Sequence, residues 1–270
     1  SATSALGGQS ACPRNRRYAC PRKTRPSAST RNVPARFNPR SIRRAIFTPR
    51  GRGVLPYYCP MAQLPQPAHS LGRPLPSRAH VSLQSEEPPT PQRRASDIRT
   101  FFDVVFSLCG RHSDRPGIIA ADGRGGSGKT SLASKLAAAA PGSEVLHIDD
   151  LDWNEPLFRW DHLLVAALSE LRSSGSLDFT PPAWPRHGRK GSIAVAAGAP
   201  FVVVEGTGAG MRAVADLIDV CIWVQTDDDA AEERGIRRDT EEGTNGDAEE
   251  SVRFWHWWMA GERAFFAADR

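Results

Sequence analysis

The eight residues GRGGSGKT, at positions 123–130, decide the fold of this 270-residue chain. They match the pattern GxxxxGK[ST], in which glycines let backbone N–H groups turn toward phosphate oxygens and the lysine reaches the terminal phosphates. The apolar run GIIAAD (117–122) precedes the match, and the helical stretch KTSLASKLAAAA (129–140) follows it. A glycine-rich turn without a ligand is the alternative, but a strand before and a helix after are the context that a phosphate-binding loop requires.

The loop is therefore predicted to bind ATP, with a threonine hydroxyl offered to Mg²⁺. The residues expected to hold the nucleotide are Gly123, Arg124, Gly125, Gly126, Ser127, Gly128, Lys129, Thr130 and Ser131. The same loop serves ATPases, GTPases, transporters and kinases, so it indicates nucleotide binding without fixing the reaction.

Strand-like and helix-like segments alternate after the loop. EVLHID (144–149), PFVVVEG (200–206) and DVCIWVQT (219–226) are rich in apolar and β-branched residues, whereas RWDHLLVAALSELRSS (159–174) spaces its apolar residues as a helix does. This alternation predicts an α/β fold, a parallel sheet with helices on both faces. The stretch FWHWWMAGERAFF (254–266) also has helical spacing, and we expect it to cover the sheet rather than to form a binding surface.

The charge is divided unevenly along the chain. Residues 1–85 hold 15 Lys and Arg and no Asp or Glu, whereas the remaining 20 basic residues accompany all 30 acidic ones. Fifteen of the 22 prolines lie between Pro13 and Pro91, without a helical or strand period. Such a segment buries too little apolar surface to fold. We expect residues 1–96 to be a disordered leader, either a transit peptide or a non-native extension, and residues 97–270 to be one P-loop kinase-like domain.

Composition also limits the location and the partners. The five cysteines include no CxxC pair, so neither zinc nor a disulfide framework is expected. The basic leader lacks the interleaved aromatic residues of a nucleic-acid-binding module, and no apolar run is long enough to span a bilayer. We expect a cytoplasmic protein, or a plastid or mitochondrial one if the leader is a transit peptide, with neither nucleic acid nor membrane as a partner. No oligomeric state is indicated.

Acidic residues follow two of the predicted strands. Asp149 and Asp150 come after the second, and Glu205 ends the third. Ligands of open α/β sheets bind beyond the carboxyl ends of the strands, where carboxylates can hold Mg²⁺ or accept a proton from a hydroxyl. A helix cap is the alternative for either aspartate alone. Thr130, Asp149 and Glu205 are therefore the predicted metal-site residues.

The ordered set GRGGSGKT, HIDDL, RWD, PRHGRKG, VVVEG and GIRRDTEEG resembles the uridine kinase and nicotinamide riboside kinase group of P-loop small-molecule kinases, over about residues 115–268. The resemblance implies that Asp149 is the base for the substrate hydroxyl and that Glu205 assists at the metal or at the reacting hydroxyl. It implies that Asp161 contacts ribose hydroxyls. The basic helix resembles a lid over the phosphates, and it offers Arg234, Arg237 and Arg238.

The resemblance is incomplete in the segment with which the family recognises the pyrimidine ring of its substrate. Uridine kinases carry a segment resembling YDFVSHSR, and here the stretch is PAWPRHGR, with Pro182 and Ala183 at the tyrosine and acid positions. His187 and Arg189 are retained, and Trp184 offers a stacking face, so these three are the expected substrate-binding residues beside Asp161. An exposed loop histidine and a packing tryptophan are the alternatives for His187 and Trp184.

These features imply ATP-dependent phosphoryl transfer to a hydroxyl of a small molecule, of nucleoside or riboside type. The residues expected to carry the reaction are Lys129, Asp149, Glu205, Arg234 and Arg238. Two other classes stay open. One is a P-loop ATPase or GTPase acting on a partner, and the other is a nucleotide-binding module without catalysis.

Overall fold

The computed structural model describes residues 43–47, 55–58, 82–88, 94–243 and 245–269. Most of the predicted leader lies outside these residues, so its disorder and the division at residue 96 stay predictions. Within the leader range the structure describes three short strands that were not expected from the composition, and a segment, residues 82–88, that packs beside the phosphate-binding loop. The strands are β1 (Arg43–Phe47), β2 (Leu55–Tyr58) and β3 (Arg94–Ser96).

Four parallel strands form the centre of the molecule, in the order β9-β4-β8-β5. Their bounds are Gly117–Asp122 for β4, Glu144–His147 for β5, Phe201–Glu205 for β8 and Val220–Val224 for β9. Every residue of β4, β8 and β9 is buried, which is typical of parallel strands covered on both faces. Beyond β9, the sheet continues through β1, parallel to it, to the antiparallel strands β2 and β3.

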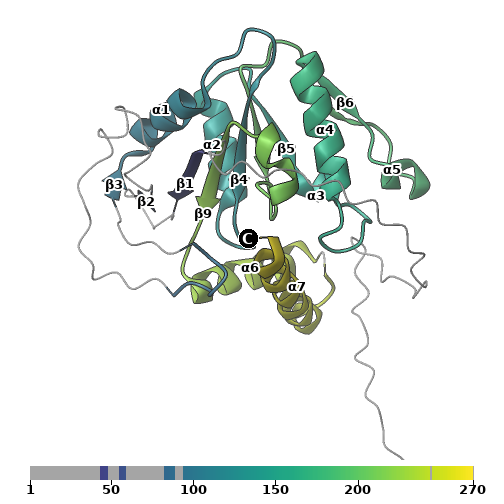
Figure 1. Ribbon diagram of the computed structural model, residues 1–270. Coiled ribbons are helices and arrows are strands. Elements are labelled where there is room, and N and C mark those ends of the chain that lie inside the picture. Colours follow the sequence, from purple (N-terminus) through teal and green to yellow (C-terminus); the bar gives the residue numbers. More distant parts are fainter. Residues whose placement is uncertain (1–42, 48–54, 59–81, 89–93, 244, 270) are drawn as a thin grey trace, which may run out of the picture.

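Helices cover both faces of the central strands (Figure 1). Ile119 and Ala121 of β4 belong to the cluster beneath α1 (Ile98–Cys109) and α2 (Lys129–Ala139), whereas Ile118 and Ala120 belong to the cluster beneath α4 (Asp161–Ser174) and the 3₁₀ helix η3 (Arg212–Leu217). This alternation follows from the two-residue period of a strand. The structure confirms the predicted α/β fold class, with a parallel sheet between two helical layers.

The predicted strand 144–149 is shorter than expected. β5 ends at His147, and the next residues form the short helix α3 (Ile148–Leu151), which has Asp149 and Asp150 in its first turn. Carboxylates are favoured beside the free N–H groups at a helix start, which accounts for the early end of the strand. As a result, both aspartates lie on a helical turn at the carboxyl edge of the sheet.

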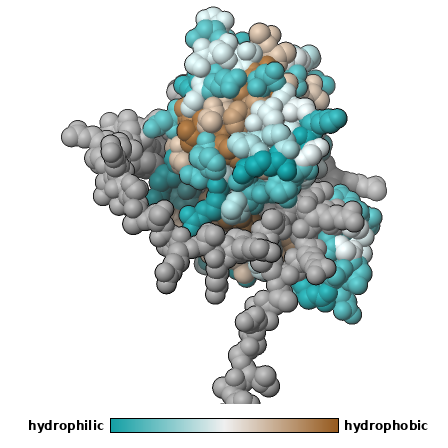
Figure 2. All heavy atoms as spheres, turned by 90° about the vertical axis from the view of Figure 1, so that its right-hand side faces the viewer, coloured by the Kyte–Doolittle hydropathy of each residue, from teal (hydrophilic) through white to brown (hydrophobic). Residues whose placement is uncertain are grey.

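A small antiparallel hairpin lies beside α4. It consists of β6 (Leu177–Phe179) and β7 (Ile193–Val195), with the short helix α5 (Ala183–Arg186) between them. Figure 2 views the molecule from this side, and it shows a hydrophobic patch within a largely hydrophilic surface. Phe179 of β6 is only partly buried against the core.

The last two helices, α6 (Asp228–Glu242) and α7 (Ala248–Asp269), pack together below the carboxyl edge of the sheet (Figure 1). The helical spacing predicted for residues 254–266 is therefore confirmed, but the expected position is wrong. Helix α7 lies at the end of the strands rather than over a face of the sheet, because α1, α2 and α4 already cover those faces. Its buried Trp255 contacts α6 and the phosphate-binding loop, and its buried Phe266 packs on Trp223 near the end of β9.

Candidate functional site

A cavity of about 610 Å³ opens at the carboxyl ends of β4, β5 and β8. It combines the phosphate-binding loop, the acidic strand ends, one side of α6 and three aromatic residues of α7. The lining residues are Gly125, Gly126, Gly128, Lys129, Thr130, Ser131, His147, Asp149, Asp150, Glu205, Gly206, Thr207, Arg234, Gly235, Arg238, Asp239, Glu242, Asn245, Phe254, Trp255 and Trp258. The structure thus brings together most of the residues predicted to bind nucleotide and metal.

The glycines of the loop are required by close backbone approaches. Gly123 has a φ of +138°, and a Cβ there would lie 2.2 Å from the carbonyl oxygen of Val224. Gly126 has a φ of +70°, and its Cβ would lie 2.2 Å from the carbonyl oxygen of Ala231. Gly128 precedes α2 with a φ of +102°. Because side chains at these positions would be strained or would clash, the loop turns tightly and presents backbone N–H groups at the start of α2.

Lys129 is buried, and its Nζ donates to the carbonyl oxygen of Arg124 at 2.8 Å, with the hydroxyl of Thr207 at 3.5 Å. No carboxylate is within ion-pair distance of its ammonium group among the described residues. The lysine therefore lines the cavity, held by oxygens of neighbouring backbone and hydroxyl groups and, within the described part of the chain, without a direct ion pair, which suits an anionic ligand such as a terminal phosphate.

Thr130 and Glu205 meet at the end of the parallel strands. The threonine hydroxyl is 3.2 Å from each carboxylate oxygen of Glu205, to which it donates. His147 donates from Nδ1 to Oε1 of the same carboxylate at 2.6 Å, and this bond raises the pKa of His147. A hydroxyl and a buried carboxylate are the hard oxygen ligands that Mg²⁺ prefers, and Mg²⁺ commonly takes few protein ligands beside phosphates and water. These residues therefore fit the metal that the loop implies.

The two aspartates of α3 occupy different surroundings. Asp149 is exposed and lines the cavity, and its charge helps to raise the pKa values of His147 and Arg238. Asp150 forms an ion pair with Arg189 instead. Both aspartates thus line the cavity, and the position of Asp150 is fixed by its ion pair with Arg189.

The predicted acceptor residues do not line this cavity. Trp184 is buried, donates from Nε1 to the carbonyl oxygen of Asp150 at 2.9 Å, and has the Arg189 guanidinium 3.6 Å from its ring centre. The stacking face expected of Trp184 is therefore already covered. His187 is exposed, with its ring edge-on to Trp153 at 6.1 Å, and Asp161 is the exposed first residue of α4. None of the three residues, nor Arg189, lines the cavity; Trp184 and Arg189 contact Asp150, which does.

The arginines of α6 divide into two sets. Arg234 and Arg238 line the cavity, as a lid over phosphates would require, and Arg238 is held by the buried carboxylate of Asp239 at 2.9 Å. Arg237 faces elsewhere, because it pairs with Glu233 at 3.5 Å on an exposed side of the helix. The structure places Arg237 outside the lining, in contrast to the expectation that it contacts the nucleotide.

Arg124 also departs from its expected role. Its side chain is fully buried and points away from the cavity, where it pairs with Glu87 at 3.4 Å and with Asp228. Gln84 donates to the same Asp228 carboxylate at 3.0 Å, so the segment 82–88 packs against the back of the loop. Ser127 is likewise buried outside the lining. These two residues shape the loop instead of offering side chains to a nucleotide.

Sequence reasoning missed several residues that hold the site. Asp122 is buried at the end of β4 and accepts from the backbone N–H groups of Gly123, Gly208 and Gly210 at 2.7, 2.8 and 3.0 Å. Burial raises its pKa. Its position directly before the GxxxxGK[ST] match was the only signal available. His147 was visible as a polar residue at a strand end, whereas Thr207 and Glu262 reach the loop through contacts between residues far apart in the sequence.

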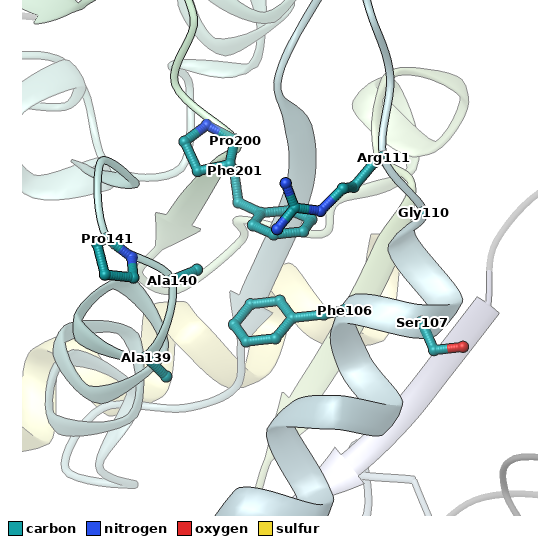
Figure 3. A pocket seen from close by; sticks show the side chains of 9 residues that line it. All are labelled: Phe106, Ser107, Gly110, Arg111, Ala139, Ala140, Pro141, Pro200 and Phe201. Atoms are coloured by element: carbon teal, nitrogen blue, oxygen red, sulfur yellow. The ribbon is translucent and has the colours of Figure 1, made fainter.

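A second cavity, of about 500 Å³, lies at the opposite end of the strands (Figure 3). It is lined by the stacked rings of Phe106 and Phe201, by Arg111, and by the residues that end α2. None of its lining residues is acidic, and it lies far from the loop that begins α2. The second cavity therefore lacks the loop, the lysine and the carboxylates that line the first one.

No protein-family model matches the chain, and no curated protein matches it. Among solved structures, the chain is similar to a "putative fructose transport system kinase" from Silicibacter sp. TM1040, with 21% identity, a TM-score of 0.44, and coverage of 63% of this chain and 93% of the other. It is also similar to a chain of the Pnkp1/Rnl/Hen1 RNA repair complex, with 12% identity, a TM-score of 0.32, and coverage of 55% and 47%. Both scores are below 0.5, so the proposals below rest on this chain's own residues.

Among the described residues, no helix is both long enough and apolar enough to cross a membrane.

Proposed function

We propose that this chain transfers the γ-phosphoryl group of ATP to a hydroxyl of a small molecule. The observation that carries the proposal is the meeting of Lys129, the Thr130–Glu205 pair and Asp149 in one cavity, with Arg234 and Arg238 on the facing helix. Phosphoryl transfer needs little covalent chemistry from a protein, and positioning and charge neutralisation provide most of the rate.

Each group has a role that its surroundings support. Lys129 and the loop amides would bind the phosphates, and the oxygens of Thr130 and Glu205 would bind Mg²⁺, which neutralises charge on the transferred group. Asp149 would accept the proton of the attacking hydroxyl, since it lines the cavity from the helical turn that follows β5, at the carboxyl edge of the sheet and beside the loop. Arg234 and Arg238 would face the phosphates from α6 and exclude water when the helix closes.

The acceptor is proposed to be of nucleoside or riboside type. Phe254 and Trp258 line the cavity, so flat aromatic faces border the space that an acceptor would enter. A planar heteroaromatic ring would be favoured there over an aliphatic chain. These residues would replace Trp184, whose face is covered by Arg189.

The proposal is tested with a panel of nucleosides, ribosides and simple sugars, each incubated with ATP and Mg²⁺ and scored for the phosphorylated product. We expect product with at least one ring-bearing acceptor, and a loss of about a hundredfold or more in Lys129→Ala. The exposed Lys135→Ala variant, on the same helix, is the matched control and should retain activity. ADP release at the same rate without any acceptor, and no phosphorylated product from the panel, would favour a hydrolase instead.

A further inference from the structure

Glu262 is a carboxylic acid side chain buried against the phosphate-binding loop. It belongs to α7, it is 0% exposed, and its Oε1 accepts from the backbone N–H of Gly125 at 2.7 Å and from the hydroxyl of Thr207 at 2.9 Å. Gly125 is the third residue of the GxxxxGK[ST] match. A residue of the last helix thus contacts the loop backbone directly.

Burial at this position is energetically unfavourable for a carboxyl group. The second oxygen, Oε2, is buried and has no hydrogen-bond partner among the described residues, and burial raises the pKa of Glu262. The charges of Lys129 and Arg124 oppose that rise, while Glu87 lies close enough for its own pKa to be raised by Glu262. An apolar side chain would cost less at a position that only packs. The hydrogen bonds that Oε1 accepts from Gly125 and Thr207 therefore explain why a carboxyl group is present at this position.

Thr207 extends the contact to the lysine. Its hydroxyl lies 2.9 Å from Glu262, 3.3 Å from the carbonyl oxygen of Gly123 and 3.5 Å from Nζ of Lys129. Lys129 in turn donates to the carbonyl oxygen of Arg124. Glu262 consequently holds the backbone amide of Gly125 directly. It also holds the hydroxyl of Thr207, which lies beside Nζ of Lys129.

The fit of α7 on the loop points the same way. A Cβ on Gly125 would lie 3.4 Å from the ring of Trp255, so the glycine backbone is in near contact with this helix. Trp255 also packs on Gly235 of α6, where a Cβ would lie 1.9 Å from the ring. The loop, α6 and α7 therefore pack against one another near Glu262, and a displacement of one of them must displace the other two.

We propose that Glu262 is a positioning residue of the nucleotide site, which holds Gly125 and Thr207 so that the loop amides and Lys129 are arranged to receive phosphates. The inference rests on the nucleotide binding within the proposed function, but not on the transfer step. The hydrogen-bond acceptor, rather than a negative charge, is what the position requires. Glutamine keeps that acceptor, and alanine removes it.

The test measures ADP affinity of the full chain by titration calorimetry in the presence of Mg²⁺. We expect Glu262→Ala to weaken ADP binding by at least tenfold and Glu262→Gln to stay within threefold of the wild type. Glu249→Ala, at an exposed position in the first turn of the same helix, should change nothing. With an active acceptor, KM for ATP should rise in Glu262→Ala while KM for the acceptor stays constant, a division that a general loss of folding would not produce.

Thr207→Val provides a second variant should Glu262→Ala fail to fold, since it removes the hydroxyl and keeps the shape of the side chain. It should weaken ADP binding by severalfold. A folded Glu262→Ala protein with wild-type affinity would overturn the inference, and so would a glutamine variant as impaired as the alanine one. A wild type that binds ADP but phosphorylates no acceptor would contradict the proposed function and leave this inference standing.

Discussion

Nδ1 of His147 lies 2.6 Å from Oε1 of Glu205, and the parallel register of β5 on β8 pairs these same two residues. The contact is therefore fixed by the sheet itself rather than by a mobile loop. Because Glu205 also accepts from the hydroxyl of Thr130, the imidazole orients the carboxylate that is proposed to bind Mg²⁺. Partners that orient a metal-binding carboxylate commonly affect metal affinity by about ten- to a hundredfold.

His147→Gln should therefore raise the Mg²⁺ concentration needed for half-maximal product formation by about tenfold or more. Glu205→Gln should raise it further, because a neutral amide binds Mg²⁺ less well than a carboxylate does. The exposed His162→Gln variant on α4 is the control. The measurement is a magnesium titration at fixed free ATP, and identical curves for wild type and His147→Gln would refute the orienting role.

Glu87 gives the protein a pH dependence of stability. Burial raises the pKa of Glu87 from an ordinary value of 4.5 to about 7, against the opposing charge of Arg124. Between these values the folded chain keeps a proton that the unfolded chain has lost, so stability is lost as the pH rises from about 4.5 to 7. The full displacement corresponds to at most about 3 kcal/mol.

Glu87→Gln should remove this component, so the difference in unfolding free energy between the variant and the wild type should increase with pH over that window. Denaturant titrations at pH 5 and pH 7.5 measure it, with Glu249→Gln as the exposed control. A difference that does not change with pH would show that Glu87 does not retain its proton on folding. Glu87 would then be ionised in the folded chain, as a carboxylate paired with Arg124.

The central sheet was predictable because its strands are continuous apolar runs. GIIAAD corresponds residue for residue to β4, and the runs at 200–206 and 219–226 each contain the strand that the structure has. The short strands β1, β2 and β3 were not predictable, since a Pro- and Arg-rich composition hides strands that depend on pairing with β9 and with one another. Non-local pairing outweighs local composition there.

The site divides in the same way. Lys129, Thr130 and Glu205 were found from the loop pattern and from the strand ends, because motif and topology together place them. Glu262 lies 137 residues after Gly125, the loop residue that it contacts, and no local sequence rule predicts how its helix packs. One signal was nevertheless present. Glu262 is the only acidic residue within FWHWWMAGERAFF, and helical spacing puts it on the buried side with Trp255, Met259 and Phe266.

Gly235→Ala tests the packing of α7 on α6. In an open helix this change usually stabilises a protein by about 0.5–1 kcal/mol. Here the new Cβ would lie 1.9 Å from the Trp255 ring, so α7 must shift, and overpacking of this kind costs about 1–3 kcal/mol. We expect a lower melting temperature and weaker ADP binding. Glu233→Ala, on the exposed side of α6, should leave both unchanged, and a stabilised Gly235→Ala protein would contradict the packing.

Asp149→Asn separates binding from chemistry. If Asp149 accepts the proton of the acceptor hydroxyl, the asparagine variant should bind ATP almost as the wild type does, because the loop, Lys129 and Glu205 are untouched. Product formation should fall by about a hundred- to ten-thousandfold, the usual contribution of a general base. The comparison requires both quantities on the same preparation, with ATP affinity from calorimetry and the rate from product analysis.

Asp150→Asn is the matched control for this last prediction, because it removes the neighbouring carboxylate from the same short helix α3. Asp150 is paired with Arg189. Its loss should therefore loosen the segment around Arg189 and raise KM for the acceptor, while the maximal rate falls by less than about tenfold. Should Asp149→Asn keep the full rate with every acceptor that the wild type uses, or should Asp150→Asn prove the more damaging of the two, the base would not be Asp149. The second outcome would move the proton transfer to Asp150, and it would require the Asp150–Arg189 ion pair to open when the acceptor binds.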